Sequence, residues 1–159
     1  MERTKGNIPL SKQMKKHSNT PVAKKKEFAG NTDKMISTGS TLLNLAISGG
    51  RVRGGGLPGG VLVEIFGPNG SGKTVLLSEI AGGVQRQGGE IIFHDPEARL
   101  NKQFAKMFGL NLNDKDYHKT NTITELFSAI RGWEPAASKK KQVMHGIFAD
   151  SLAALSTDL

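Results

Sequence analysis

Residues 67–74 read Gly-Pro-Asn-Gly-Ser-Gly-Lys-Thr, which is the pattern G-x4-G-K-T. Glycines permit a tight turn whose backbone N–H groups point inward at phosphate oxygens. A helix is expected to begin where the turn ends, and a helix N-terminus also favours an anion. Lys73 adds a charge for the β and γ phosphates, and the Thr74 hydroxyl can ligate Mg²⁺. The predicted phosphate-binding loop comprises Gly67, Pro68, Asn69, Gly70, Ser71, Gly72, Lys73 and Thr74.

The segments around this loop alternate between strand and helix patterns. The run from Val61 to Phe66 (VLVEIF) is apolar and bounded by glycines, which is typical of a buried parallel strand. Lys73 to Gln87 is predicted as a helix. Further strands are expected at 90–95, 116–120 and 143–150, and further helices at 41–48, at 99–108 and from 122 or 124 to 132. This alternation predicts an α/β fold with a parallel sheet.

Charge divides the 159 residues into two parts. Lys and Arg number 22 and Asp and Glu 14, so the net charge is +8. Residues 1–34 hold nine basic and three acidic side chains, whereas residues 35–159 hold 13 and 11. We therefore expect a flexible basic tail (1–34) and a nearly neutral domain (35–159). The tail fits a solvated segment, attraction to nucleic-acid phosphates, or protein docking through the apolar pair Phe28-Ala29.

Several classes of protein are excluded by composition. The chain has no cysteine, so it has no disulfide framework, thiolate zinc site or cysteine nucleophile. It has no run of 18 apolar residues, and its basic N-terminus lacks the apolar region of a secretory signal. A soluble cytoplasmic protein with no membrane contact is expected.

Two carboxylates are expected near the phosphate loop. Asp150 ends the apolar run Ile147-Phe148-Ala149, and parallel strands share the carboxyl edge where ligands bind, so Asp150 is a candidate for Mg²⁺. Hydrolysis also requires a group that orients or deprotonates water. Glu97, just past the second strand, is the candidate, and Asp95 is its nearest competitor. His94 is predicted to be a structural strand residue.

Three features distinguish the chain from transporter-type ATPases, which can carry the same loop. Ser151 rather than Glu follows Asp150, no LSGGQ-like signature precedes that strand, and Glu97 ends the second strand. The sequence resembles the ATPase core of the RecA recombinase family, in a bacterial or bacteriophage form. The resemblance spans residues 36–155 and is carried, in family order, by ISTGS with LLNLAISGG, by GLPGG with VLVEIFGPNGSGKT, by FHDPEARLNKQFAKMFG and by IFADSLAAL.

The resemblance implies roles for single residues. Lys73 and Thr74 correspond to the residues that bind phosphate and Mg²⁺, Asp150 to the aspartate that holds Mg²⁺ through water, and Glu97 to the catalytic glutamate.

The adenine contacts, the cofactors and the partners also follow from the resemblance. Asn101 and Phe104 correspond to positions that flank the adenine, where the family commonly has Asp and Tyr. Phe104 can still stack on a base but has no hydroxyl. The family uses ATP and Mg²⁺ and forms filaments on single-stranded DNA with ATP between subunits. The resemblance thus implies a DNA-dependent ATPase that binds single-stranded DNA, self-associates as a filament or ring, and pairs and exchanges homologous strands in recombination and repair.

The sequence departs from the family pattern at both ends. The residues before Ile36 do not resemble the family's N-terminal helix and strand. The sequence ends at Leu159, so we expect a fragment that lacks the DNA-binding loops, the phosphate-sensing glutamine, the trans-acting lysines and the C-terminal domain. In the family, the strand after Asp150 inserts beside the phosphate-loop strand. Without it, we expect the remaining strands to close the gap or apolar edges to stay exposed, with marginal stability or self-association.

Two alternatives to a recombinase stay open at this point. One is a different ATPase on the same fold, such as a helicase or a regulatory ATPase. The other is a nucleotide-binding fragment that does not hydrolyse ATP, since the groups that stabilise the transition state contribute orders of magnitude in rate.

Overall fold

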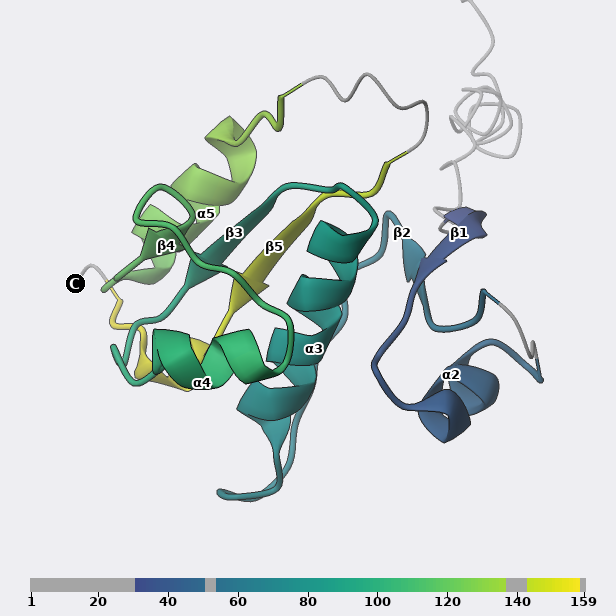
Figure 1. Cartoon of the computed structure of the whole chain (residues 1–159). Helices are drawn as coiled ribbons and strands as arrows, with labels where there is room; N and C mark the ends of the chain where they lie inside the picture. Colours follow the sequence, from purple (N-terminus) through teal and green to yellow (C-terminus); the bar gives the residue numbers. More distant parts are fainter. Residues whose placement is uncertain (1–30, 51–53, 137–142, 158–159) are drawn as a thin grey trace, which may run out of the picture.

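The computed structural model describes residues 31–50, 54–136 and 143–157 (Figure 1). The Lys24–Lys26 run and the Phe28-Ala29 pair lie outside these residues. The elements are, in chain order, β1 (Asn31–Ile36), α2 (Thr41–Ile47), β2 (Leu57–Gly59), α3 (Lys73–Arg86), β3 (Ile91–His94), α4 (Lys102–Met107), β4 (Tyr117–His118), α5 (Ile123–Gly132), β5 (Gly146–Ala149) and the 3-10 helix η1 (Leu152–Ala154).

The central sheet has three parallel strands in the order β4-β3-β5. Phe93 of β3 is in register with Tyr117 of β4 on one side and with Phe148 of β5 on the other. The helix α3 lies at the β5 side of the sheet and α5 at the β4 side (Figure 1). The predicted parallel α/β fold is confirmed, and the carboxyl ends of all three strands meet at one edge of the sheet.

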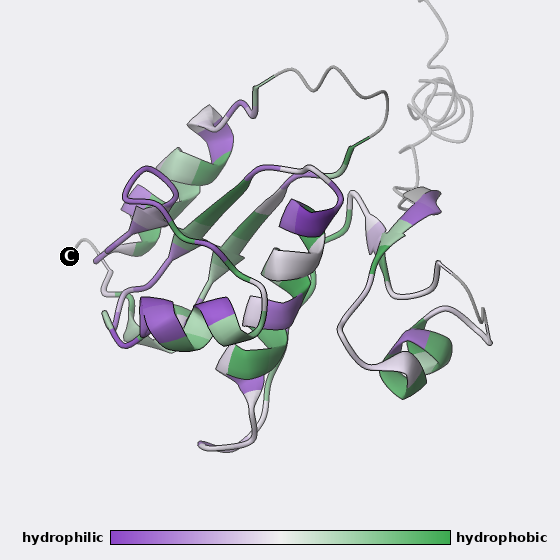
Figure 2. Ribbon diagram, viewed as in Figure 1, coloured by the Kyte–Doolittle hydropathy of each residue, from purple (hydrophilic) through white to green (hydrophobic). Residues whose placement is uncertain are grey.

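The apolar core lies between the sheet and α3. The rings of Phe93 and Phe148 stack with their centroids 6.3 Å apart, and Ala81 and Val84 of α3 are fully buried. Figure 2 shows β3 and β5 mostly in the hydrophobic colour. Burial of each large apolar side chain contributes roughly 1.5–3 kcal/mol, so this contact accounts for much of the stability of the domain.

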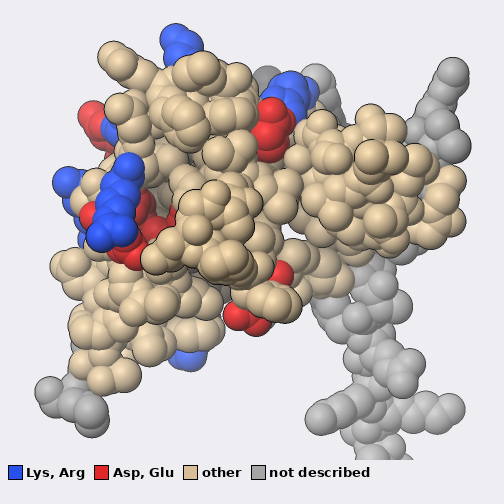
Figure 3. Space-filling model, turned by 90° about the horizontal axis from the view of Figure 1, so that it is seen from below, with Lys and Arg blue, Asp and Glu red and all other residues tan. Residues whose placement is uncertain are grey.

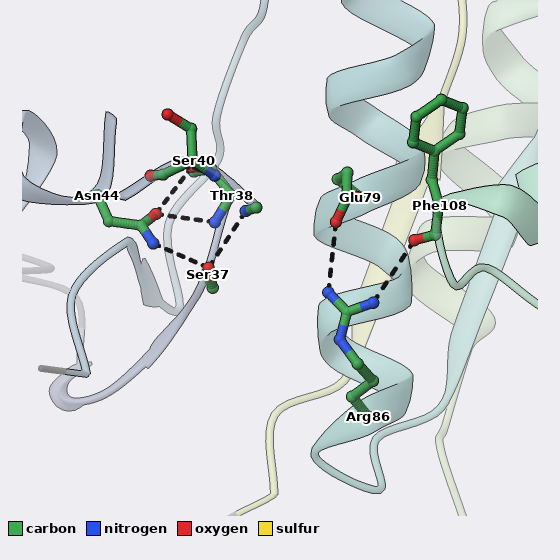
Figure 4. Close-up of polar contacts among 8 residues, drawn as sticks. Ser37, Thr38, Ser40, Asn44, Glu79, Arg86 and Phe108 are labelled. Carbon is green, nitrogen blue, oxygen red and sulfur yellow. Dashed lines mark hydrogen bonds and ion pairs between the residues drawn. The ribbon is translucent and has the colours of Figure 1, made fainter. Parts of the chain in front are cut away.

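The helix α3 continues through Gly82, although an interior glycine costs a helix about 1 kcal/mol relative to alanine. The reason is a close approach: a Cβ on Gly82 would lie 2.8 Å from the carbonyl carbon of Gly109. Arg86 strengthens this junction, because its guanidinium donates to the Phe108 carbonyl oxygen at 3.5 Å and pairs with Glu79 at 3.4 Å (Figure 4).

The strands β1 and β2 form a separate antiparallel pair that the sequence pattern did not predict. Because β1 begins inside the range 1–34, the end of the expected tail lies in a strand. Asn44 then ties the following turn to α2. Its Oδ1 accepts from the Thr38 backbone N–H at 2.9 Å, and its Nδ2 donates to the Ser37 hydroxyl at 2.8 Å (Figure 4).

The segment Val61–Phe66 is not the buried parallel strand that its composition predicts. It pairs with no other strand among the described residues, and the Leu62 and Phe66 side chains are 99% and 87% exposed. Only Ile65 packs against the core cluster. A strand needs a neighbour for its backbone hydrogen bonds, and the sheet stops at β5 in the described residues. Of the two expected outcomes, the exposure of apolar residues is therefore the correct one.

Several other elements are also shorter than expected. The strands predicted at 90–95 and 116–120 cover only Ile91–His94 and Tyr117–His118. The helix predicted at 99–108 covers only Lys102–Met107, because the N–H groups of Arg99 and Leu100 donate to the Asp95 carboxylate in a preceding turn. The strand predicted at 143–150 is reduced to Gly146–Ala149, the residues that pair with β3.

The surface of the described residues agrees with a nearly neutral body. On the face seen in Figure 3, acidic and basic side chains lie next to one another, and much of the remainder is uncharged. Among the described helices, none has the length and apolar character that crossing a membrane requires.

Candidate functional site

The phosphate loop leads directly into α3. Gly67 to Gly72 are exposed, and Gly72 is the N-cap of the helix with φ +87°, a left-handed conformation that favours glycine. As at any helix N-terminus, the first backbone N–H groups of α3 have no carbonyl partner within the helix, and such groups attract anions. The Lys73 ammonium donates to the carbonyl oxygens of Gly67 and Pro68 at 2.9 and 3.0 Å. Lys73 thus lies over its own loop, where it can exchange carbonyl oxygens for phosphate oxygens.

The loop meets the strand-ending carboxylate. The Thr74 hydroxyl donates to Oδ2 of Asp150 at 2.5 Å, although the two residues are 76 positions apart. The backbone holds Asp150 in place, because its N–H donates to the His94 carbonyl oxygen at 3.0 Å across β3 and β5. The two residues predicted to serve Mg²⁺ are therefore adjacent.

Glu97 joins the same group of side chains. Ser151, which follows Asp150 through a cis peptide bond, donates its hydroxyl to Glu97 Oε1 at 3.1 Å. The other carboxylate oxygen, Oε2, forms an ion pair with Arg99 Nη1 at 2.7 Å. A continuous polar chain therefore runs from Thr74 to Arg99.

Asp95 has a different environment from Glu97. Its side chain is buried and accepts hydrogen bonds from the Tyr117 hydroxyl at 2.7 Å and from the backbone N–H groups of Leu100 at 2.8 Å and Arg99 at 3.3 Å. Burial first, and then the bond to Asp95, raise the pKa of Tyr117 to about 12. Asp95 therefore organises the turn, and Glu97 is the better-placed candidate to contact water.

His94 also has a structural environment, as its isolation in the sequence predicted. Its side chain is 3% exposed, its Nδ1 lies 2.6 Å from the Thr120 hydroxyl, and its ring stacks on His118 with centroids 5.4 Å apart. Burial first, and then repulsion from His118, lower the pKa of His94, while Glu125 opposes the shift. Nε2 has no hydrogen-bond partner in the described part of the chain.

The two predicted adenine residues lie at the start of α4. Asn101 is the N-cap of that helix, and its Oδ1 accepts from the N–H groups of Gln103 at 2.8 Å and Phe104 at 3.1 Å. The Phe104 ring is 41% exposed and meets Phe108 edge to face at 4.9 Å. Asn101 thus has a helix-capping role, and Phe104 presents a partly free aromatic face on which a base can stack.

The donor set of this site fits magnesium. Mg²⁺ is usually held by one or two protein oxygens together with phosphates and water, rather than by an all-protein cage. The Thr74 hydroxyl and the Asp150 carboxylate are such oxygens. Within residues 31–50, 54–136 and 143–157, no group of three or more His, Cys, Asp or Glu side chains could hold a metal ion.

The profile of the family described as "RecA N-terminal domain" matches residues 7–123, well over half of the sequence. The chain belongs to the RecA N-terminal domain family. Protein RecA of Streptomyces venezuelae is 41% identical over 80 residues, which is 50% of this chain and 20% of that protein. Protein RecA of Anaplasma marginale is 39% identical over 93 residues, or 58% and 24%. The chain thus matches about a fifth to a quarter of the length of these RecA proteins.

Two members of the site were not among the residues singled out in the sequence. In the sequence, Ser151 is informative only because it is not glutamate, and no motif points to Arg99. A signal for Ser151 existed, since a hydroxyl directly after a strand-ending aspartate lies at the same sheet edge. No periodicity could reveal the Arg99 contact, because it depends on a turn whose geometry is set by the buried Asp95 side chain.

Proposed function

We propose that this chain is the ATP-binding core of an ATP-dependent DNA recombinase, which binds single-stranded DNA and carries out homologous pairing and strand exchange. The observation that carries the proposal is the contact between Thr74 of the phosphate loop and Asp150 at the end of β5. This contact supports the proposal because it places the proposed phosphate loop next to the proposed magnesium carboxylate, in a chain that belongs to the RecA N-terminal domain family.

Each side chain has a distinct part in the proposed site. The loop amides and Lys73 bind the phosphates, and Thr74 and Asp150 hold Mg²⁺ directly or through water. Mg²⁺, when bound, neutralises charge on the phosphate oxygens. Glu97 accepts a proton from, or orients, the attacking water, and the Ser151 hydroxyl fixes the direction of its carboxylate. Phe104 stacks on the adenine, with Asn101 beside it.

The proposal for the whole protein goes further than for this chain. We infer a cytoplasmic DNA-dependent ATPase that self-associates as a filament or ring, with ATP at the subunit interface. Membership of the RecA family and the basic residues 1–34 support DNA as the partner, because clustered Lys and Arg attract the phosphate backbone.

Nucleotide binding by the chain tests the proposal. We expect MgATP to bind, and Lys73→Ala to weaken binding about tenfold or more, since a hydrogen bond to a charged group contributes roughly 1.5–3 kcal/mol. Removing Mg²⁺ with a chelator should also weaken binding. Isothermal titration calorimetry measures both effects.

Lys119→Ala supplies the matched control, because Lys119 is an exposed lysine between β4 and α5. Its affinity for MgATP should equal that of the unaltered chain. Equal affinities of the Lys73→Ala and Lys119→Ala variants would contradict the role of the loop.

A further inference from the structure

The turn after β3 has an unusual backbone. Ala98 has φ +52°, a left-handed conformation that residues with a side chain rarely adopt. Two hydrogen bonds to Asp95 hold this turn. The Ala98 N–H donates to the Asp95 carbonyl oxygen at 3.1 Å, and the Arg99 N–H donates to the Asp95 carboxylate at 3.3 Å. Such strained positions occur where surrounding contacts impose them, often at functional sites.

The turn brings Glu97 and Arg99 together. Their side chains form the ion pair at 2.7 Å, with 83% of the Arg99 side chain exposed against 29% for Glu97. An ion pair so open to solvent contributes little to stability, typically about 0–1 kcal/mol. Folding stability is therefore a weak reason for a guanidinium at this position.

The series of contacts that joins Arg99 to the predicted phosphate loop gives a stronger reason. Glu97 is linked through Ser151 to Asp150, so two carboxylates lie at the edge where the polyphosphate is proposed to bind. An ionised carboxylate without a cationic partner would repel a nearby terminal phosphate and so weaken the binding of a nucleoside triphosphate. Arg99 places a positive charge on the outer oxygen of Glu97, away from the oxygen that Ser151 contacts.

We propose that Arg99 is a positioning residue of the nucleotide site, which neutralises Glu97 and thereby lets the terminal phosphate of a nucleoside triphosphate bind beside that carboxylate. This inference rests on the proposed function. It requires that Arg99 acts through Glu97 rather than by touching the phosphate. It also requires that Arg99 strengthens the binding of ATP more than the binding of ADP. The reason is that only ATP has the terminal phosphate that is proposed to lie beside Glu97.

A double-mutant cycle separates these requirements. MgATP and MgADP affinities are measured by calorimetry at low salt for the unaltered chain, Arg99→Ala, Glu97→Gln and the double variant. Arg99→Ala should weaken MgATP binding about three- to tenfold and MgADP binding less than about twofold, as expected for unit charges near a surface. In the Glu97→Gln background, where no carboxylate needs neutralising, Arg99→Ala should change MgATP binding by less than about twofold. Arg131→Ala, an exposed arginine at the end of α5, is the matched control and should leave affinity unchanged.

Each other outcome overturns the inference in a recognisable way. An equal loss of MgATP affinity with and without Glu97→Gln would mean direct contact between Arg99 and phosphate. No loss from Arg99→Ala in the chain with Glu97 unaltered would mean a surface ion pair only. If Arg99→Ala lowered the melting temperature of the chain as well as its affinity for MgATP, the role of Arg99 would be structural. Failure of the unaltered chain to bind MgATP would instead overturn the proposed function, on which this inference depends.

Discussion

The two sides of the candidate site differ in how they are held. The carboxylate side, at the ends of β3 and β5, rests on buried groups such as Phe93 and Asp95, which are 0% and 2% exposed. The loop side is reached through Val61–Phe66, in which Leu62 is 99% exposed and no strand pairing occurs among the described residues. The carboxylates are therefore positioned by a packed sheet, whereas the phosphate loop is positioned mainly by the start of α3.

The largest expected effect compares two phenylalanines. Phe93→Ala removes a fully buried ring that stacks on Phe148, and should lower the free energy of unfolding by about 3–5 kcal/mol. Phe66→Ala removes a ring that is 87% exposed, and should change it by less than about 0.5 kcal/mol. Urea unfolding followed by circular dichroism measures both. Similar losses for the two variants would show that Val61–Phe66 is packed in solution.

A smaller effect compares two helical glycines. Gly82→Ala places a Cβ 2.8–2.9 Å from backbone atoms of Phe108 and Gly109, and should destabilise the chain by about 1–3 kcal/mol. Gly132→Ala, at the end of α5, meets nothing within 4 Å and should stabilise it by up to about 1 kcal/mol. Thermal unfolding measures the difference. A Gly82→Ala variant as stable as the unaltered chain would mean that α3 and the end of α4 are not closely packed.

The smallest expected effect concerns how the stability of the carboxylate side depends on pH through His94. Because the pKa of His94 is lowered in the folded chain, the unfolded chain binds this proton more readily. The contribution of neutral His94 to the free energy of unfolding is thus fully present above about pH 6.5, the ordinary pKa of histidine. This contribution declines as the pH falls below that value. His94→Asn, which cannot titrate, should show a shallower loss of stability between about pH 7 and pH 5 in denaturant titrations.

The pH experiment has a clear opposing outcome. If His94→Asn lost stability between about pH 7 and pH 5 as steeply as the unaltered chain, a titratable group other than His94 would be responsible for the pH dependence.

The sequence was most informative where a motif is continuous. The helix that follows the glycine-rich turn and the position of Asp150 just after a strand were predicted from local pattern. The contact between Thr74 and Asp150 agrees with the shared carboxyl edge of a parallel sheet. It was least informative for β1 and β2, whose residues lack an apolar alternation and form strands by pairing with each other. The roles of Lys73, Thr74, Glu97 and Asp150 stay predictions that the binding experiments test.

The sequence by itself determined the parallel α/β class and the positions along the chain of the glycine-rich turn and of the acidic residues near it, because glycine spacing and strand-to-helix alternation are local properties. Only the tertiary structure decided that the most apolar run, Val61–Phe66, is exposed, because burial requires a neighbouring strand that composition cannot guarantee. It also decided that Glu97 carries an arginine partner, because the turn that joins them depends on a carboxylate buried against Tyr117.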